Sequence, residues 1–260
     1  MFWYSCVCSK RKRDELNSIL KSYRYLKRYL VYKKSYKIFE LDSNQYERRF
    51  RMVWKDREPL LYDSTAKTGF DEHYVYHLAW ASRLLKEINP SEHIDIGSSI
   101  YFPAMMSSQY RIKYFEYRPP SIELDNLEVG KADLCNLSFS NESIKSLSTM
   151  HVVEHIGLGR YGDKLDYNGD LKAIKELIRV LKIGGHLLFV VPVGKPKIIF
   201  NAHRIYSYEQ ILEYFSDLEL KQFSLIPDEA NQLGLILNAT QTQSDKQNYG
   251  CGCFWFKKQR

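Results

Sequence analysis

The amino-acid sequence predicts an α/β protein with a doubly wound, mostly parallel sheet of seven strands and a helical extension at its N-terminus. From about residue 90 onward, short apolar runs alternate with segments of helical periodicity, which is typical of a parallel sheet covered by helices. Earlier residues are rich in lysine and arginine and have the spacing of amphipathic helices. We therefore expect an extension over residues 1–58 and an α/β domain over residues 59–260.

The extension contains a predicted basic amphipathic helix over residues 13–36, where apolar side chains recur at helical spacing between lysines and arginines. Residues 1–58 hold 16 Lys and Arg against 7 Asp and Glu, a net charge of +9, whereas the remainder has a net charge of −2. A basic segment attracts anionic surfaces. Peripheral membrane contact through residues 10–36, binding to a partner, and packing on the domain are the alternatives.

Within the α/β domain we expect three helices and seven strands. A helix over residues 68–88 begins near Asp71 and ends before Pro90. A second over residues 170–181 is closed by glycines, and a third over residues 207–215 has Ser207 as its N-cap. The strands are expected at residues 93–97, 112–117, 128–133, 144–150, 186–193, 218–226 and 251–257.

The five cysteines do not predict a disulfide framework, because their number is odd and the repeated spacing is Cys-x-Cys. A zinc site that joins Cys6/Cys8 to Cys251/Cys253 is a minor alternative, since structural zinc sites use Cys-x-x-Cys. No apolar run reaches the length of a membrane span. The apolar start precedes the charged run, the reverse of a signal peptide. We expect a cytoplasmic protein, in part peripheral at the inner membrane surface.

Polar residues follow three successive strands, at the edge where doubly wound sheets bind ligands. Asp95-x-Gly97 ends the first strand, where a residue without a β-carbon lets the backbone approach a ligand. Glu116 ends the second strand and can hold the hydroxyls of a ribose. After the third strand, Asp133 can accept a hydrogen bond from an adenine amino group, with Leu134 against the ring. Each motif also has a purely structural explanation. Asp95-x-Gly97 could form a tight turn, Glu116 a surface ion pair, and Asp133 a loop cap.

Together these motifs resemble class I S-adenosylmethionine-dependent methyltransferases over residues 90–257. The family has a glycine-rich loop after the first strand, an acid after the second, Asp-Leu after the third and Glu-His after the fourth. A Leu-x-Pro-Gly-Gly turn precedes the fifth strand. The matching residues here are Asp95/Gly97, Glu116, Asp133/Leu134, Glu154/His155 and Leu181 to Gly185.

The resemblance implies a Rossmann-like methyltransferase fold with S-adenosylmethionine as cofactor. It places Asp95, Gly97 and Ser98 against the methionine part, with Glu116 on the ribose and Asp133 and Leu134 on the adenine. The first loop keeps only one of the family's glycines, and the bulky Tyr101 stands where glycine is common.

A narrower resemblance covers residues 58–257 and rests on three runs, residues 71–77, 155–163 and 200–206. They look like an uncharacterised methyltransferase-like family, a domain of unknown function linked to surface-polysaccharide and glycan biosynthesis. This resemblance implies a sugar or glycan acceptor.

Methyl transfer to a hydroxyl needs a base, and His151 and His155 are the candidates, with Glu154 to orient either of them. A glycine-rich loop follows, in which Arg160 suits an anionic group. Candidates for substrate binding are Arg160, Tyr161, Asp163, Asn201, His203, Arg204 and Tyr206. His73 and His77 have the spacing of a metal pair, but the sequence offers no third ligand, so we expect no metal.

These observations predict an O-methyltransferase for a sugar or glycan intermediate. Two alternatives remain: a degenerate methyltransferase fold that serves as a binding or scaffold module, and a glycan-related transferase with another nucleotide ligand. Blockage of the pocket by Tyr101 would favour the first. Nucleic acid is not the expected substrate, because the basic residues lie in the extension and no base-flipping motif follows the fourth strand. The sequence leaves the oligomeric state undetermined.

Overall fold

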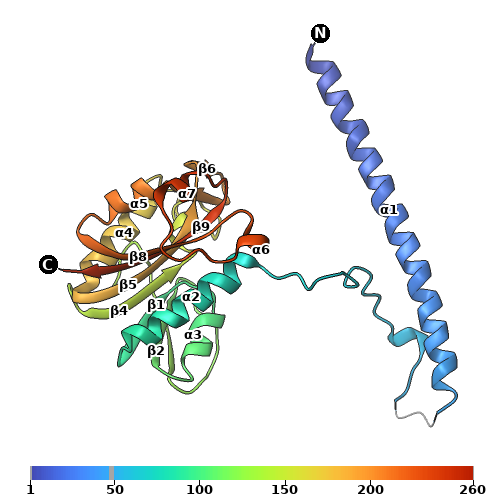
Figure 1. Ribbon diagram of the computed structural model, residues 1–260, viewed down its shortest axis with the longest axis horizontal. Coiled ribbons are helices and arrows are strands. Elements are labelled where there is room, and N and C mark those ends of the chain that lie inside the picture. Colours follow the sequence, from blue (N-terminus) through green and yellow to red (C-terminus); the bar gives the residue numbers. More distant parts are fainter. Residues whose placement is uncertain (1, 47–49, 260) are drawn as a thin grey trace. The chain divides into compact units, whose positions relative to one another are not determined.

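A computed structural model describes residues 2–46 and 50–259, with side chains from Leu20 onward (Figure 1). The chain forms two compact units, Met1–Gly69 and Phe70–Arg260. The second unit begins eleven residues later than the expected boundary, because residues 57–71 form no helix or strand and therefore belong to neither the extension's helix nor the sheet.

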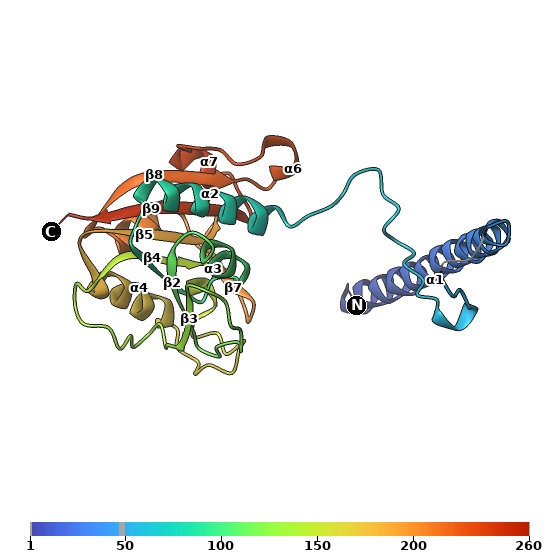
Figure 2. The same ribbon diagram turned by 90° about the horizontal axis from the view of Figure 1, so that it is seen from below.

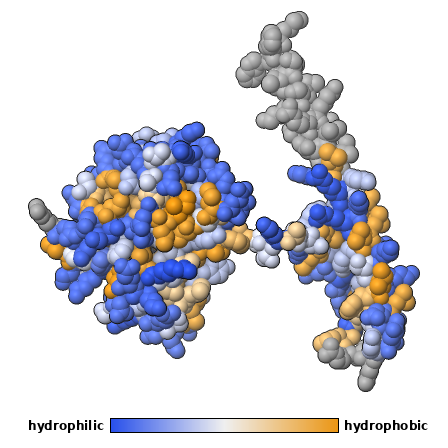
Figure 3. Space-filling view, viewed as in Figure 1, coloured by the Kyte–Doolittle hydropathy of each residue, from blue (hydrophilic) through white to orange (hydrophobic). Residues whose placement is uncertain are grey.

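The first unit contains α1 (Phe2–Ser43) and the short 3-10 helix η1 (Trp54–Asp56). The helix is longer than the predicted residues 13–36. Tyr36 packs edge-on against Trp54, with ring centroids 4.7 Å apart. Leu26 and Leu30, on the predicted apolar stripe, are exposed. Figure 3 shows hydrophobic and hydrophilic residues intermixed on the described surface of this unit. The side chains of Cys6 and Cys8 lie outside the described residues.

The second unit contains a seven-stranded sheet with the order β3-β2-β1-β4-β5-β9-β8. Neighbours from β3 to β5 pair in parallel, and β9 pairs antiparallel with β5 and β8. The predicted doubly wound, mostly parallel sheet is confirmed. Its strands are β1 (Glu92–Ile96), β2 (Arg111–Glu116), β3 (Leu127–Lys131), β4 (Ile144–Met150), β5 (Leu181–Val193), β8 (Leu218–Ile226) and β9 (Gly250–Lys258).

Helices cover both faces of the sheet (Figures 1 and 2). On one face, α4 (Gly169–Val180) and α5 (Tyr208–Tyr214) pack on the β5 side chains Leu187 and Phe189. On the other, α2 (Glu72–Ile88) and α3 (Tyr101–Met106) pack on Leu188 and Val190. Because successive side chains of a strand point to opposite faces, the continuous apolar run of β5 fills both cores.

Strand β5 begins five residues before the prediction and includes the glycines that were expected to close the preceding helix. Ile144 pairs with Leu181 but Ser146 pairs with His186, so residues 182–185 bulge out of the β4–β5 ladder. A Cβ on Gly185 would lie 2.7 Å from the Lys182 carbonyl oxygen, and the bulge therefore needs a glycine there.

Several short elements were not predicted. They are α3, the 3-10 helix η2 (Val153–His155), the hairpin of β6 (Lys197–Ile199) and β7 (His203–Ile205), α6 (Ala230–Leu233) and α7 (Gln241–Asp245). The helices of the described residues include none with the length and hydropathy to span a bilayer.

Candidate active site

Two cavities adjoin at the carboxyl ends of β1 and β4, where the strand order reverses. The first, called the polar cavity, measures about 870 Å³ and includes Asp71, His73, Glu154 and Asp228 in its wall. The second, called the apolar cavity, measures about 660 Å³ and lies beside the ends of β2 and β3. Both cavities are lined by Gly97, His151, His155 and Tyr161. The four shared residues therefore form the junction between two binding spaces.

The turn after β1 forms the floor of this junction. Gly97 has φ +75°, and a Cβ there would lie 2.9 Å from Val152 Cγ1. Ser98 lines the polar cavity, and its Oγ accepts a hydrogen bond of 3.0 Å from the Met150 amide. The turn thus needs a glycine for its own conformation and is anchored to the end of β4.

Asp95 is buried behind this turn and lines neither cavity, so its expected contact with the methionine part of a cofactor stays a prediction. Its carboxylate accepts hydrogen bonds from the Ser98 amide (3.2 Å) and the Ser148 hydroxyl. Ser148 also contacts Nε2 of the buried His93 at 2.9 Å. Burial raises the pKa of Asp95 to about 7.

The apolar cavity brings together the other residues expected at a cofactor. Glu116, at the end of β2, accepts a 2.8 Å hydrogen bond from the Tyr117 amide. The Tyr114 hydroxyl lies 3.4 Å from its second oxygen and donates its shorter bond, of 2.9 Å, to the Ser98 carbonyl oxygen. Asp133 accepts a 2.9 Å bond from the Cys135 amide, and Leu134 lies beside it. The motif spacing therefore places an acid and an Asp-Leu pair in one cavity, as expected.

Tyr101 is the first residue of α3, is 70% exposed and lines neither cavity. It does not block the cofactor pocket. The observation that would have favoured a degenerate fold is therefore absent from the described residues.

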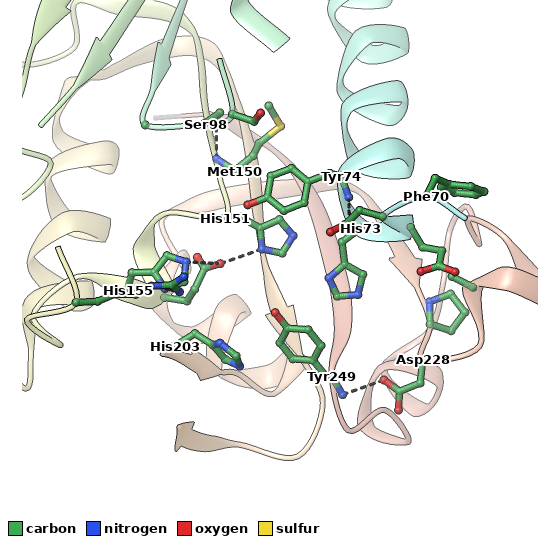
Figure 4. Close-up of a pocket in the computed structure, with 18 of the residues that line it drawn as sticks. Phe70, His73, Tyr74, Ser98, Met150, His151, His155, His203, Asp228 and Tyr249 are labelled. Atoms are coloured by element: carbon green, nitrogen blue, oxygen red, sulfur yellow. Dashed lines mark hydrogen bonds and ion pairs between the residues drawn. The ribbon is translucent and has the colours of Figure 1, made fainter. Parts of the chain in front are cut away.

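Five of the protein's seven histidines lie at the polar cavity or in contact with its lining residues (Figure 4). Glu154, in η2, is 1% exposed and has histidines on both sides. His151 Nδ1 lies 2.9 Å from Glu154 Oε1, and His155 Nε2 lies 3.7 Å from the same oxygen. His151, just before this 3-10 helix, has φ 58°, and the two histidines meet at the same carboxylate oxygen.

The second nitrogens of these two histidines have different partners. His151 Nε2 lies 3.3 Å from the Sγ of Cys251 in β9. His155 Nδ1 lies 2.6 Å from the Ala202 carbonyl oxygen and therefore carries a proton. Arg160 donates to the same carbonyl at 3.1 Å, and the longer 3.4 Å approach of its guanidinium to His155 Nδ1 is secondary.

His73 and His77 do not form the metal pair that their spacing suggested. His77 Nδ1 donates to the His73 carbonyl oxygen at 2.6 Å, and its ring is fully buried. The His73 ring instead stacks on His151, with centroids 5.6 Å apart, and on Tyr249 at 5.1 Å. Burial, followed by the nearby His151, lowers the pKa of His73 to about 4. His73 is therefore a neutral imidazole near pH 7.

Of the expected substrate residues, Arg160, Tyr161 and His203 line the polar cavity. Asp163 lines the apolar cavity and does not pair with Arg160. Its carboxylate accepts hydrogen bonds from the amides of Gly157 (2.8 Å), Gly159 and Tyr161. Asp163 therefore holds the glycine-rich loop in shape.

The other three substrate candidates are corrected by their positions. Arg204 is 5% exposed; it donates to the Ile156 carbonyl oxygen at 2.6 Å and pairs with Asp170 at 3.4 Å. Tyr206 is buried and donates to Asp170 at 2.9 Å. Asn201 is exposed and lines neither cavity. In the structure Arg204 and Tyr206 fasten η2 and α4 to the β6–β7 hairpin.

Sequence reasoning missed the part of the site that comes from the C-terminal strands. Tyr249 lines the polar cavity, and burial raises its pKa to about 12. Its amide donates a 2.9 Å hydrogen bond to Asp228, which lies beyond the end of β8. The signal was weak, because a tyrosine before the repeated Cys-x-Cys has no distinctive spacing to the earlier motifs.

Comparisons with known proteins bear on the fold. A family described as "Caenorhabditis protein of unknown function, DUF268" matches residues 127–249, just under half of the chain. No curated protein matches the sequence. The N-methyltransferase NodS of Bradyrhizobium japonicum, solved in complex with S-adenosyl-L-homocysteine, superimposes with a TM-score of 0.51 at 13% identity, covering 78% of this chain and 92% of its own.

Two further solved structures have a TM-score of 0.50. The YcgJ protein of Bacillus subtilis is 13% identical and covers 72% of this chain and 99% of its own. A chain of the Haloferax volcanii complex that contains the Trm112 methyltransferase activator is 14% identical and covers 72% and 91%. At these identities the likeness shows the fold alone. The second unit of this protein has the Rossmann-like fold of class I methyltransferases.

The buried Asp95 predicts a specific pH dependence of stability. Because its pKa is about 7 in the folded protein and ordinarily 3.8 for an aspartate in water, the folded state keeps a proton that the unfolded state releases between these values. The stabilisation is complete below pH 4 and is lost as pH rises to 7. Replacing Asp95 with Asn should remove this loss, a difference of up to about 1.4 kcal/mol per pH unit.

Urea denaturation of both proteins at pH 5.0 and 7.5 measures this effect. Wild type should lose more unfolding free energy than Asp95→Asn over this interval. Equal losses in the two proteins would show that Asp95 titrates normally.

Proposed function

We propose that this protein is an S-adenosylmethionine-dependent methyltransferase that methylates a hydroxyl of a sugar or glycan intermediate. The cofactor would occupy the apolar cavity and the acceptor the polar cavity. The observation that carries this proposal is the junction of the two cavities at Gly97, His151, His155 and Tyr161. A methyl group passing from one ligand to the other has to cross such a junction.

The apolar cavity has residues that fit the cofactor. Glu116 has two carboxylate oxygens at the end of β2, where an acid binds ribose hydroxyls in this type of sheet. Leu134 and Val152 offer apolar surface for a purine ring, and Asp133 offers an acceptor for its amino group. When bound, S-adenosylmethionine supplies a methyl group already activated by its sulfonium, so the protein mainly orients the acceptor.

The contacts of the two histidines favour His155 as the base. Its Nδ1 proton is held by the Ala202 carbonyl oxygen, which leaves Nε2 as the proton acceptor. Glu154, 3.7 Å from that nitrogen, stabilises the imidazolium that forms when the acceptor hydroxyl loses its proton. His151 has both nitrogens occupied, by Glu154 and by Cys251. We assign His151 a positioning role.

The polar cavity suits a polyhydroxylated acceptor, because the acids Asp71, Glu72, Glu154 and Asp228 in its wall can accept hydrogen bonds from hydroxyls. Aromatic rings of Tyr74, Tyr161 and Tyr249 line it together with Asp228 and Arg160. Arg160, the arginine in this wall, supports a negatively charged group such as a phosphate or carboxylate on the acceptor. A sugar phosphate combines both features, which is consistent with the glycan-related resemblance of the sequence.

Calorimetric titration of S-adenosylmethionine into the purified full chain tests the cofactor assignment. Wild type should bind the cofactor, and Glu116→Ala should weaken binding at least tenfold, because it removes the acceptors for the ribose. Glu128→Ala, an exposed acid on neighbouring β3, is the matched control and should bind like wild type. Absence of binding to folded wild type, with binding of a nucleotide sugar instead, would support a transferase with another nucleotide ligand.

Transfer of labelled methyl groups to a panel of sugars, sugar phosphates and nucleotide sugars tests the base. His155→Ala should lower the turnover rate by about 10²- to 10⁴-fold while cofactor affinity stays unchanged. His186→Ala, a histidine of β5 outside both cavities, should retain the wild-type rate. An unchanged rate in His155→Ala would rule out this histidine as the base.

We also propose that residues 10–36 contact the cytoplasmic face of a membrane. The net charge of +9 in the extension and the exposed Leu20, Leu26 and Leu30 support this role. Replacing Lys21, Arg24 and Lys27 together with Glu should reduce sedimentation of the full chain with anionic phospholipid vesicles.

The matched control for this experiment replaces three exposed lysines of the second unit with Glu. They are Lys145, Lys175 and Lys182. It should sediment with anionic vesicles like wild type, and none of the proteins should sediment with neutral vesicles. Equal loss in both triple variants would show that vesicle binding does not depend on the extension.

A further inference from the structure

Three potential metal ligands from distant parts of the chain meet at the wall of the polar cavity. His73 comes from α2, His151 from the turn after β4, and Cys251 from β9. One ligand atom of each lies within 4.8 Å of the other two. Imidazole nitrogen and thiolate sulfur are both zinc ligands, and three protein ligands are the number that leaves one position of a tetrahedral zinc site open.

The spacing of the two buried ligands matches a shared ion. His151 Nε2 and Cys251 Sγ are 3.3 Å apart. Bond lengths of about 2.0–2.1 Å to nitrogen and 2.3 Å to sulfur in a tetrahedral site imply a separation of about 3.5 Å. Cys251 is fully buried, and in the metal-free protein burial raises the pKa of its thiol well above the usual value. Binding a cation would release this proton to solvent.

A second observation comes from the far side of His151. Its Nδ1 bonds to the buried Glu154 at 2.9 Å. Metal-bound histidines donate their second ring proton to a carboxylate in this way, which fixes the ring and directs the other nitrogen at the ion. The His151 ring thus lies between Glu154, at its Nδ1, and Cys251, at its Nε2.

The third ligand is available. Neither ring nitrogen of His73 has a hydrogen-bond partner among the described residues, and the half-buried ring stacks on His151. Its ligand atom lies within 4.8 Å of those of His151 and Cys251.

We propose that His73, His151 and Cys251 bind a zinc-like divalent cation whose fourth coordination position opens into the polar cavity. His73 and His151 line that cavity, whereas Cys251 lies behind its wall. A soft thiolate with two imidazoles selects zinc over magnesium or calcium, which prefer oxygen ligands. This binding site stands independently of methyl transfer.

Its consequence for catalysis rests on the proposed function. An acceptor hydroxyl bound at the open position would lose its proton more readily, because a divalent cation stabilises the alkoxide. His155, at the junction beside His151, would receive that proton. The ion would therefore select acceptors with a free hydroxyl or thiol within reach of the apolar cavity.

Titration of Co²⁺ into the metal-free full chain tests the site without any activity measurement. We expect one equivalent to bind, with the strong d–d absorption of tetrahedral cobalt and a thiolate-to-cobalt charge-transfer band, and Zn²⁺ should displace it. Cys251→Ser should abolish the charge-transfer band, and His73→Ala should weaken binding at least tenfold. Glu154→Gln should weaken it about 10- to 100-fold.

Cys135→Ser is the matched control, since the Cys135 thiol contacts the Gly169 carbonyl oxygen and is not among the three ligand groups. Its spectrum should equal that of wild type, and circular dichroism confirms the fold of each variant. Absence of the charge-transfer band in wild type, or its persistence in Cys251→Ser, would overturn the metal site. Cobalt binding without S-adenosylmethionine binding would overturn the proposed function alone, and the reverse result would overturn the metal site alone.

Discussion

The buried carboxylate of Glu154 is the constraint on which the site depends. An ionised carboxylate removed from water is costly unless positive or hydrogen-bonding groups surround it. One of its oxygens meets both His151 and His155, while the other has no hydrogen-bond partner among the described residues. A proton or a cation on the neighbouring histidines offsets this cost. The two imidazoles therefore act on each other through the carboxylate that they share.

The topology explains why these groups meet. Parallel strands end at one edge of the sheet, so the residues after β1 and β4 meet at the switch point between them. Strand β9 is antiparallel, and its first residue, Gly250, pairs with Val193 at the end of β5. The beginning of β9 therefore lies at the edge where the other strands end. This reversal brings Tyr249 and Cys251 to residues about a hundred positions earlier in the sequence.

The sheet and the cofactor-type cavity could be predicted because both depend on local patterns. Apolar runs placed the strands mostly within one or two residues, and an acid directly after a strand can only lie at the ligand edge. The substrate residues could not be predicted in the same way. Arg204 and Asn201 are both polar residues after β5, yet tertiary contacts bury the first among carbonyl oxygens and leave the second in solvent. Composition near a site does not determine which side chains face it.

The same limit applies to His151 and His155. The sequence offers both as candidate bases, and the structure distinguishes them by the partners of their ring nitrogens. A backbone carbonyl fixes the tautomer of His155 and leaves a basic nitrogen at the junction. A thiol occupies the corresponding nitrogen of His151. Because both rings share Glu154, a charge gained by one changes the field at the other. A cation on His151 would face the same carboxylate oxygen as His155. The proposed cation site and the proposed base are therefore connected through a single buried side chain.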